Sequence, residues 1–313
     1  MLTIRTLIEP ADPIHIDDPD RRTIVAERDS IRIGRLCAHI NPLLTYRGTT
    51  PGLVGWYECA DDPEASRGLL DAAVRLLSAR GCTTVIGPID GDTWHRYRVA
   101  LPSEERGFFL DLQSPPWQAA QWRDSGFAPI AEYLSTEIAV GAVDTGRIEQ
   151  ATEDFTRLGV TIRKIDPRRF ESELALIHDI ACRSFDGNFL YTPIALEEFI
   201  ALYRPVLPAV DPELVEIAVD AAGAPVAFCF ALPDLMAPAG TRVIAKTAGR
   251  IRRHDLRGLG SHLIERVHLT ARRMGCSSVI HALMYESNRS RKVLGDVART
   301  IRRYELYGML RAG

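Results

Sequence analysis

The segment 255–261 of this 313-residue sequence combines glycines and basic residues in a way that suits anion binding. Gly258 and Gly260 allow a backbone to approach a bulky anion closely, because neither residue carries a Cβ atom. An apolar pattern typical of a helix follows, and the first turn of a helix presents unpaired N–H groups and a partial positive charge. Positive side chains nearby are Arg252, Arg253 and Arg257. We therefore expect a diphosphate group to bind at this segment.

Two common diphosphate motifs do not fit the segment. A dinucleotide fingerprint needs a third glycine, where Leu263 stands, and it follows the first strand of its domain rather than a late one. A P-loop needs a Gly-Lys-Ser/Thr tripeptide, which does not follow this loop. The structural alternative to a ligand site is a tight turn between a strand and a helix.

Strands and helices must hold this segment in place, and the apolar periodicity predicts two successive sets of them. The first set is expected to contain strands at 30–40, 53–59, 83–86 and 132–140, with helices at 61–80 and 117–123. The second is expected to contain strands at 161–165, 213–220, 225–232, 242–249, 278–284 and 300–309, with helices at 168–183 and 260–274. This order is a mixed α/β pattern. The polar segment 141–159 lacks a strong period, so we place the boundary between two domains there, as 1–145 and 146–313.

In this context the second half of the chain resembles the GNAT superfamily of N-acetyltransferases. The sequence of 257–261, Arg-Gly-Leu-Gly-Ser, resembles the acetyl-CoA pyrophosphate loop of that family, Arg/Gln-x-x-Gly-x-Gly/Ala. The segment 278–284 resembles the fifth strand of the family, 286–290 its helix-opening asparagine motif, and 302–307 its closing strand. The resemblance covers residues 160–313.

The first half resembles the same fold more faintly. Trp122, Gly126 and Phe127 match the closing aromatic-x-x-x-Gly-Phe pattern of the family, while Asp61 and Asp62 stand where a glycine loop would be. Carboxylates repel a diphosphate, so we expect no cofactor in this half. The resemblance implies a mixed α/β protein with two acyl-CoA N-acyltransferase (GNAT) folds in tandem, of which the N-terminal copy is degenerate.

The resemblance also implies that acetyl-CoA lies in a V-shaped gap between two splayed parallel strands, 242–249 and 278–284. An amine then attacks the thioester, with a base to deprotonate the amine and an acid to protonate the thiolate. The residues expected to bind the cofactor are Ala248, Gly249, Arg250, Arg257, Gly258, Leu259, Gly260, Ser261, Asn288 and Arg291. The structural alternative to cofactor binding is a plain helix cap for Asn288 and a solvated side chain for Arg291.

Three positions depart from the family pattern. Asp255 stands where the family usually has Arg or Gln, the strand 242–249 lacks the frequent glutamate base, and Gly295 stands where a tyrosine acid is common. We expect Tyr285 and His281 to be the catalytic residues instead. The alternatives are a packing role for Tyr285 and a buried, hydrogen-bonded core position for His281.

A mixed polar and aromatic segment follows the first helix of the second half, at the place where GNAT folds cover the acceptor site. The alternative to an acceptor pocket is a surface loop whose aromatic residues fix it to the core. The residues expected to bind the substrate are Asp186, Asn188, Phe189 and Tyr191. Candidates for the same wall from the first half are Trp94, His95 and Tyr97.

The composition disfavours several other classes of protein. A formal net charge of −3 argues against a nucleic-acid partner, which calls for a basic surface. The six cysteines contain no C-x-x-C pair, so we expect reduced thiols and neither a disulfide framework nor a metal site. The N-terminus lacks the apolar region of a signal peptide, and no apolar run is long enough to span a bilayer. We expect a cytoplasmic protein without a membrane partner.

The expected function is N-acyl transfer from acetyl-CoA to the amine of a small molecule, such as an amino acid or a polyamine. The alternative is a catalytically silent CoA-binding sensor or scaffold, which the missing tyrosine and strand carboxylate would fit. A third hypothesis is kinship with the aminoacyl-tRNA-dependent ligases, which also use doubled GNAT folds. The near-neutral charge disfavours a tRNA partner.

Overall fold

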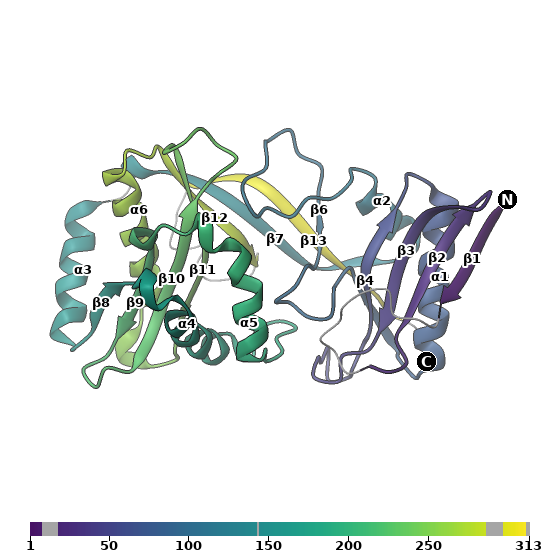
Figure 1. Cartoon of the computed structure of the whole chain (residues 1–313), viewed down its shortest axis with the longest axis horizontal. Helices are drawn as coiled ribbons and strands as arrows, with labels where there is room; N and C mark the ends of the chain where they lie inside the picture. Colours follow the sequence, from purple (N-terminus) through teal and green to yellow (C-terminus); the bar gives the residue numbers. More distant parts are fainter. Residues whose placement is uncertain (8–17, 143, 286–296, 311–313) are drawn as a thin grey trace.

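The computed structural model describes residues 1–7, 18–142, 144–285 and 297–310. It consists of two halves, each with helices packed on a mixed sheet, and the two sheets are continuous with each other (Figure 1). Across the described ranges, every helix falls short of the length or the apolar character that a membrane-spanning helix needs.

In the first half, one long helix covers the sheet. Helix α1 buries Leu69, Leu70 and Leu77 against the strands, because these residues recur at helical spacing. Asp62 caps the helix by accepting a hydrogen bond from the backbone N–H of Ala65 at 3.0 Å. The elements of this half are β1 (Leu2–Leu7), β2 (Arg22–Arg28), β3 (Ile31–His39), β4 (Gly52–Cys59), α1 (Pro63–Ala79), β5 (Thr84–Gly87), β6 (Val99–Ala100), α2 (Gln118–Asp124) and β7 (Ala128–Ala139).

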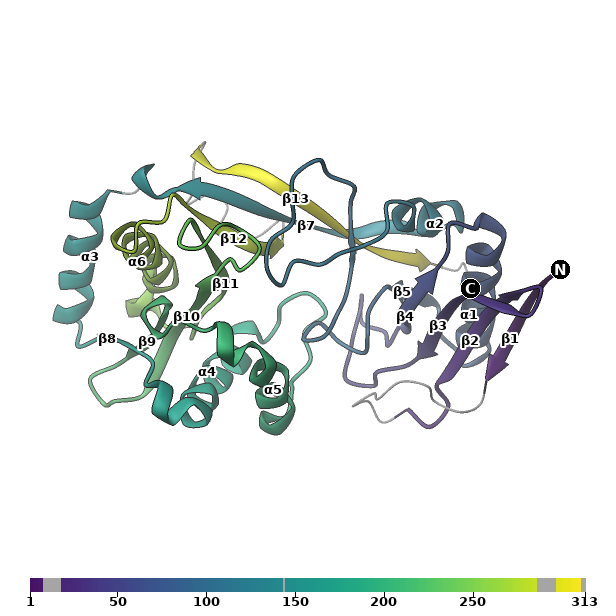
Figure 2. The ribbon, with the colours of Figure 1, turned by 45° about the horizontal axis from the view of Figure 1, so that its top comes forward.

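The second half has helices on both faces of its strands. Helix α6 lies on one side of β10 and β11, with α3 outside it, and α4 and α5 lie on the other side (Figure 2). The core between these layers is apolar and includes Ile244, Leu259 and Leu263, all fully buried. The elements of this half are α3 (Thr145–Arg157), β8 (Thr161–Lys164), α4 (Phe170–Phe185), α5 (Leu196–Tyr203), β9 (Val215–Val219), β10 (Pro225–Pro233), β11 (Arg242–Arg250), α6 (Leu259–Arg273), β12 (Ser278–Tyr285) and β13 (Arg299–Leu310).

Two long strands join the halves. The 13-stranded sheet has the order β1-β2-β3-β4-β5-β13-β7-β12-β11-β10-β9-β8, with β6 paired to β13 beside this path. Strand β13, at the end of the second half, pairs with β5 of the first, and β7 of the first half pairs with β12 of the second. Figure 1 shows β7 and β13 crossing together from one half to the other. Each half therefore supplies a strand to the sheet of the other.

The strands and helices expected from periodicity are present within a few residues of the expected ends. The segment 141–159, in which no strong period was recognised, contains α3. Its apolar residues Ile148 and Phe155 are buried, and Phe155 packs on His262 of α6 with ring centroids 5.4 Å apart. Two apolar positions in an otherwise polar helix give too weak a period to recognise. Strands β1 and β2 and helix α5 were not predicted.

The parallel strands of the first half do not open. Strands β4 and β5 pair in parallel only at two positions, but the chain after β5 continues to bond to β4. The N–H of Ile89 donates to the carbonyl of Val54 at 2.9 Å, and the N–H of Trp56 donates to Asp90 Oδ1 at 2.6 Å. Because the segment after β5 stays bonded to β4, no gap opens between the two strands at this place.

Candidate active site

In the second half, the parallel strands β11 and β12 separate along their length. Their last register pair is Ala245 with His281, although both strands continue for several residues beyond it. At the same level, the pairing of β11 with β10 contains a bulge that leaves Lys246 without a register partner. The two strands therefore diverge in the way that the resemblance implies.

A cavity of about 1070 Å³ lies at this divergence and takes its walls from both halves of the chain. This volume is at the upper end of the usual range for small-molecule sites, about 300–1,000 Å³. Ten of the residues singled out in the sequence line it: Ala248, Ser261, Asn188, Phe189, Tyr191, His281, Tyr285, Trp94, His95 and Tyr97. Trp94 connects the two walls, because its Nε1 donates a hydrogen bond to the carbonyl of Thr192 at 2.8 Å.

Other predicted site residues lie beside the cavity rather than in its wall. The backbone N–H of Arg250 donates to Ser184 Oγ at 2.9 Å, and the carbonyl of Asp186 accepts from Arg252 at 2.7 Å. These groups are already engaged within the chain. The predicted residues outside the lining are Gly249, Arg250, Arg257, Gly258, Leu259, Gly260 and Asp186. Asn288, Arg291 and Gly295 lie outside the described residues.

The glycine segment forms the start of α6, which reaches the cavity at Ser261. Gly258 is the N-cap residue with φ of 91°, a conformation that favours glycine. No side chain of the described residues caps this helix, so its first N–H groups are available to an anion. A Cβ atom at Gly260 would lie 3.7 Å from the Cβ of Arg250, an ordinary contact. These features fit the diphosphate of CoA.

The carboxylate of Asp255, which departs from the family pattern, is paired. Arg253 donates to Asp255 Oδ2 at 2.6 Å and to Asp220 Oδ2 at 2.7 Å. The hydrogen bond from Arg253 lowers the pKa of Asp255, so this carboxylate is ionised and its charge is compensated locally. Repulsion of a diphosphate by Asp255 is correspondingly reduced.

His281 and Tyr285 both reach the cavity, but their contacts differ. His281 Nε2 lies 2.8 Å from the Nε2 of His268, and burial followed by the charge of His268 lowers the pKa of His281 to about 3. A histidine with this pKa is neutral at physiological pH and is a weak base. Tyr285 stacks on Phe189 with ring centroids 5.6 Å apart and an interplanar angle of 15°. Its ring therefore packs against Phe189, in the loop after α4, while it lines the cavity.

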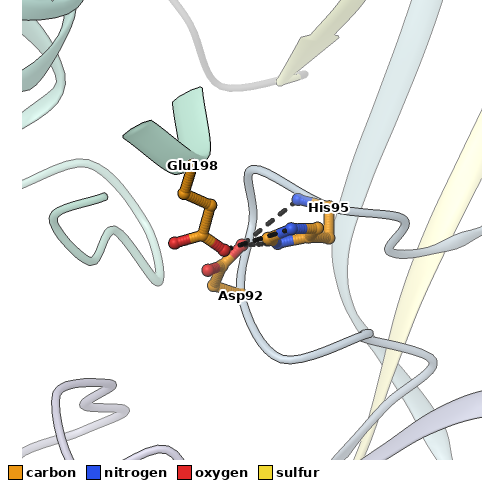
Figure 3. A group of neighbouring side chains, drawn as sticks. All are labelled: Asp92, His95 and Glu198. Carbon is orange, nitrogen blue, oxygen red and sulfur yellow. Dashed lines mark hydrogen bonds and ion pairs between the residues drawn. The ribbon is translucent and has the colours of Figure 1, made fainter. Parts of the chain in front are cut away.

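A second histidine of the cavity has acidic partners on both ring nitrogens (Figure 3). His95 lies in the loop between β5 and β6, with its Nδ1 2.9 Å from Asp92 Oδ1. Its Nε2 lies 3.4 Å from Oε1 of Glu198, which extends from α5 of the other half. The hydrogen bond to Asp92 is the largest cause that raises the pKa of His95, and the charge of Glu198 acts in the same direction. His95 is therefore the stronger base of the two histidines.

The same three side chains offer a possible set of metal ligands. One ligand atom each from Asp92, His95 and Glu198 lies within 4.8 Å of the others. However, Asp92 Oδ1 also accepts hydrogen bonds from the backbone N–H groups of Trp94 at 2.8 Å and His95 at 3.2 Å. A carboxylate oxygen offers about two lone pairs, so this oxygen is already saturated. Asp92 Oδ1 thus acts as a hydrogen-bond acceptor that orients His95.

The cationic residues of the cavity wall that were not among the predicted site residues are Arg96, Arg98, Arg147 and Lys246. Arg98 follows Trp94 and His95 in the same loop, and Lys246 occupies the bulge of β11. A signal for Lys246 is visible in the sequence, because it is the charged residue within the otherwise uncharged stretch 243–249. Nothing local in the sequence marks Arg98, since only the fold brings its loop to the second half.

No family model matches the chain. Protein YghO of Escherichia coli (strain K12) is 24% identical over 222 residues, which cover 67% of this chain and 54% of that protein. A bacterial ceramide synthase of Caulobacter vibrioides (strain NA1000 / CB15N) is 24% identical over 225 residues, which cover 66% of this chain and 56% of that protein. The chain thus spans about half the length of the curated relatives that it matches.

Solved structures identify the fold. A GCN5-related glucosamine N-acetyltransferase region of a fungal multi-domain GH3 β-N-acetylglucosaminidase has a TM-score of 0.53 at 14% identity, covering 92% of this chain and 33% of that one. A tandem GNAT protein from the clavulanic acid biosynthesis pathway has a TM-score of 0.50 at 12% identity, covering 95% of this chain and 86% of that one. Both resemble the chain over nearly its whole length. The chain therefore has the mixed α/β GNAT fold, and one of these neighbours is itself a tandem GNAT protein.

Proposed function

We propose that the chain is an N-acyltransferase that transfers an acyl group from acyl-CoA, in the simplest case acetyl-CoA, to an amine held in the cavity. The observation that carries this proposal is the position of His95. This histidine has a raised pKa and lines the same cavity as the diverging ends of β11 and β12. A base and an opening for a thioester thus meet in one site, as N-acyl transfer requires.

In this proposal the residues of the chain have the following roles. The first N–H groups of α6 hold the diphosphate, and the ends of β11 and β12 flank the thioester. Bound acyl-CoA supplies the activated carbonyl. His95 takes a proton from the incoming ammonium group, and Asp92 holds Nδ1–H so that Nε2 is the basic nitrogen. Glu198 Oε1 lies beside Nε2 and attracts the ammonium group by its charge. Tyr285 remains our candidate for the acid that protonates the leaving thiolate.

The size and lining of the cavity extend the range of substrates beyond the smallest amines. Aromatic rings from both halves line it, including Trp94, Tyr133 and Phe189. A volume of about 1070 Å³ exceeds the needs of an acetyl group and a small amino acid. Ceramide is an amide, so the name of the Caulobacter relative agrees with amide formation. We infer that a bulkier amine or a longer acyl chain also fits.

The first experiment is titration calorimetry of the protein with acetyl-CoA and with longer acyl-CoA thioesters. Gly260→Glu places a carboxylate at the expected diphosphate site, and Gly260→Ala is the matched uncharged control. We expect the parent and Gly260→Ala to bind and Gly260→Glu to lose binding. Absence of binding by the folded parent would reject the acyl-CoA proposal.

Turnover then separates an enzyme from a silent CoA sensor, the alternative favoured by the absence of a carboxylate from β11. A screen of amines with the parent and His95→Gln measures this directly. We expect turnover by the parent and a decrease of about 100-fold in His95→Gln, the usual range for loss of a general base. Binding of acyl-CoA without turnover of any amine would support the sensor.

A further inference from the structure

Arg98 is a buried cation in the wall of the cavity. Its exposed fraction is 7%, and its guanidinium carbon lies 3.9 Å from the ring centroid of Tyr97 and 4.3 Å from that of Tyr133. Its φ of 71° lies in the left-handed region, which is uncommon for residues other than glycine. Such a backbone conformation persists where the surrounding structure fixes the position of a functional side chain.

Part of the hydrogen-bonding capacity of the Arg98 side chain is not used by the described part of the chain. Its Nε and Nη1 atoms are buried and have no acceptor among the described residues. The faces of Tyr97 and Tyr133 stabilise the positive charge but offer no acceptor in the plane of the guanidinium. Buried donors normally have partners, so these N–H groups indicate an acceptor that enters through the cavity.

Lys246 presents a second cation to the same cavity. It projects from the bulge of β11, where the strands diverge, and its Nζ makes a long 3.4 Å contact with the carbonyl of Leu110. Burial, and next the charge of Arg98, lower the pKa of Lys246 to about 8. The positive charges of buried Arg98 and half-buried Lys246 therefore repel each other, and an anion between them would relieve this repulsion.

The acidic side chains of the lining have partners of their own. Asp111, whose charge acts on Lys246, accepts a hydrogen bond from the hydroxyl of Tyr304 at 2.5 Å and pairs with Arg302 at 3.1 Å. Its charge is thus shared between Arg302 and Lys246. The other acidic residues of the lining are engaged with α3: Glu265 with the side chain of Arg147, and Asp144 with the backbone N–H of Arg147.

We propose that Arg98 and Lys246 bind an oxyanion, either a carboxylate or a phosphate, that is part of the acceptor amine. This assignment rests on the proposed N-acyltransferase function. The diphosphate of CoA has its own site at the start of α6, so the oxyanion belongs to the second substrate. His95 lies three residues before Arg98 in the same loop, which places the base and the anion site close together. The acceptor class is therefore a compact amine with an anionic group, such as an amino acid or a phosphorylated amino alcohol.

Calorimetry and steady-state kinetics with three matched amines test this proposal. The probes are β-alanine, which carries a carboxylate, phosphoethanolamine, which carries a phosphate, and ethanolamine, which carries neither. We expect the parent to prefer at least one anionic amine over ethanolamine by about 10- to 100-fold, the value of a charge-assisted contact. Arg98→Met and Lys246→Met should remove this preference without weakening ethanolamine, and Arg98→Lys should restore part of it. The two anionic probes decide between carboxylate and phosphate.

Arg96→Met is the matched control. Arg96 lies in the same loop and lines the same cavity, but it is exposed, and its guanidinium donates to the carbonyl of Gln113 at 3.2 Å. We expect this variant to keep the preference of the parent. Melting temperatures show whether each variant folds. If Arg98→Met does not fold, Lys246→Met alone tests the proposal.

The outcomes separate this proposal from the proposed function. Equal use of anionic and neutral amines by the parent, or a preference that survives both methionine substitutions, would overturn the anion site while leaving acyl transfer in place. Tight binding of an anionic amine that depends on Arg98 and Lys246, without turnover of any amine, would keep the anion site and reject the acyltransferase.

Discussion

His95 and His281 line one cavity, yet their surroundings give them opposite proton affinities. Hydrogen bonding to Asp92 raises the pKa of His95, whereas burial lowers the pKa of His281 to about 3. A residue type alone therefore does not identify a base, because desolvation and neighbouring charges decide which histidine can hold a proton near neutral pH. His281 as a catalytic residue remains a prediction.

The pH dependence of turnover tests the pairing of Asp92 with His95. The base must be unprotonated to act, so kcat/KM should rise with pH through the pKa of His95, above its ordinary value of about 6.5. Asp92→Asn removes the largest cause of the raised pKa. We expect the acidic limb of the profile to move to lower pH and the plateau to fall. The measurement is kcat/KM from pH 5 to 9 with a saturating acyl donor.

A control for this profile is Glu58→Gln, which neutralises an exposed carboxylate paired with Arg35 in the first half. Its profile should coincide with that of the parent. If the acidic limb of Asp92→Asn also stays in place, then His95 is not the group that titrates.

The side chains of Asp92, His95 and Glu198 also allow a test of the metal alternative. Proton transfer to His95 needs no metal, so we expect turnover to be unchanged after dialysis against a chelator. Measurement of turnover before dialysis, after it, and after addition of Zn²⁺ or Mn²⁺ gives the answer. Activity that disappears on chelation and returns with one metal would assign a metal centre to these residues.

At the scale of elements, periodicity predicted most strands and helices but not which of them pair or pack together when they are distant in the sequence. The start of α6 was predictable because glycine spacing and helix polarity are local properties of residues 255–261. The wall of the cavity was only partly predictable. Asn188, Phe189 and Tyr191 could be recognised because they lie in one loop. Arg98 comes from a loop about 90 residues earlier in the sequence. Its role depends on long-range packing, which periodicity does not contain.

The two halves also differ at their pairs of parallel strands, β4 with β5 and β11 with β12. In the first half, the chain after β5 bonds to β4, and a Cβ atom at Gly55 would lie 2.4 Å from the carbonyl oxygen of Ile89. We expect Gly55→Ala to lower the free energy of unfolding by about 1–3 kcal/mol, because the backbone at this contact cannot move freely. Urea denaturation followed by circular dichroism measures this change.

Gly146→Ala is the matched control, since its Cβ would make an ordinary 3.6 Å contact with Asp144 and the residue lies in the first turn of α3. This variant should be as stable as the parent or slightly more stable. Equal stabilities for both alanine variants would show that the first half tolerates an opening between β4 and β5.

At the scale of the whole molecule, the exchange of β7 and β13 makes the halves interdependent. Strand β13 lies between β5 and β7, and β12 is bordered by β7 and β11. The cavity depends on the same arrangement, because Trp94 and His95 of the first half contact Thr192 and Glu198 of the second. The boundary between 1–145 and 146–313 therefore remains a proposal about the origin of two copies, and it does not separate two independent sheets.

Production of the two halves as separate fragments tests this interdependence. Residues 143–313 produced alone would keep β13 without β5 and β7, and would leave one edge of β12 unpaired; exposed strand edges promote aggregation. We expect this fragment to aggregate or remain unfolded when produced alone, and to form a stable complex when produced together with residues 1–142. Size-exclusion chromatography and circular dichroism of each fragment, of the pair and of the intact chain give the comparison. A complex that binds acyl-CoA would show that strand pairing, rather than the covalent connection, holds the site together. A monomeric 143–313 fragment as stable as the intact chain would instead mean that the second half completes its sheet without β7.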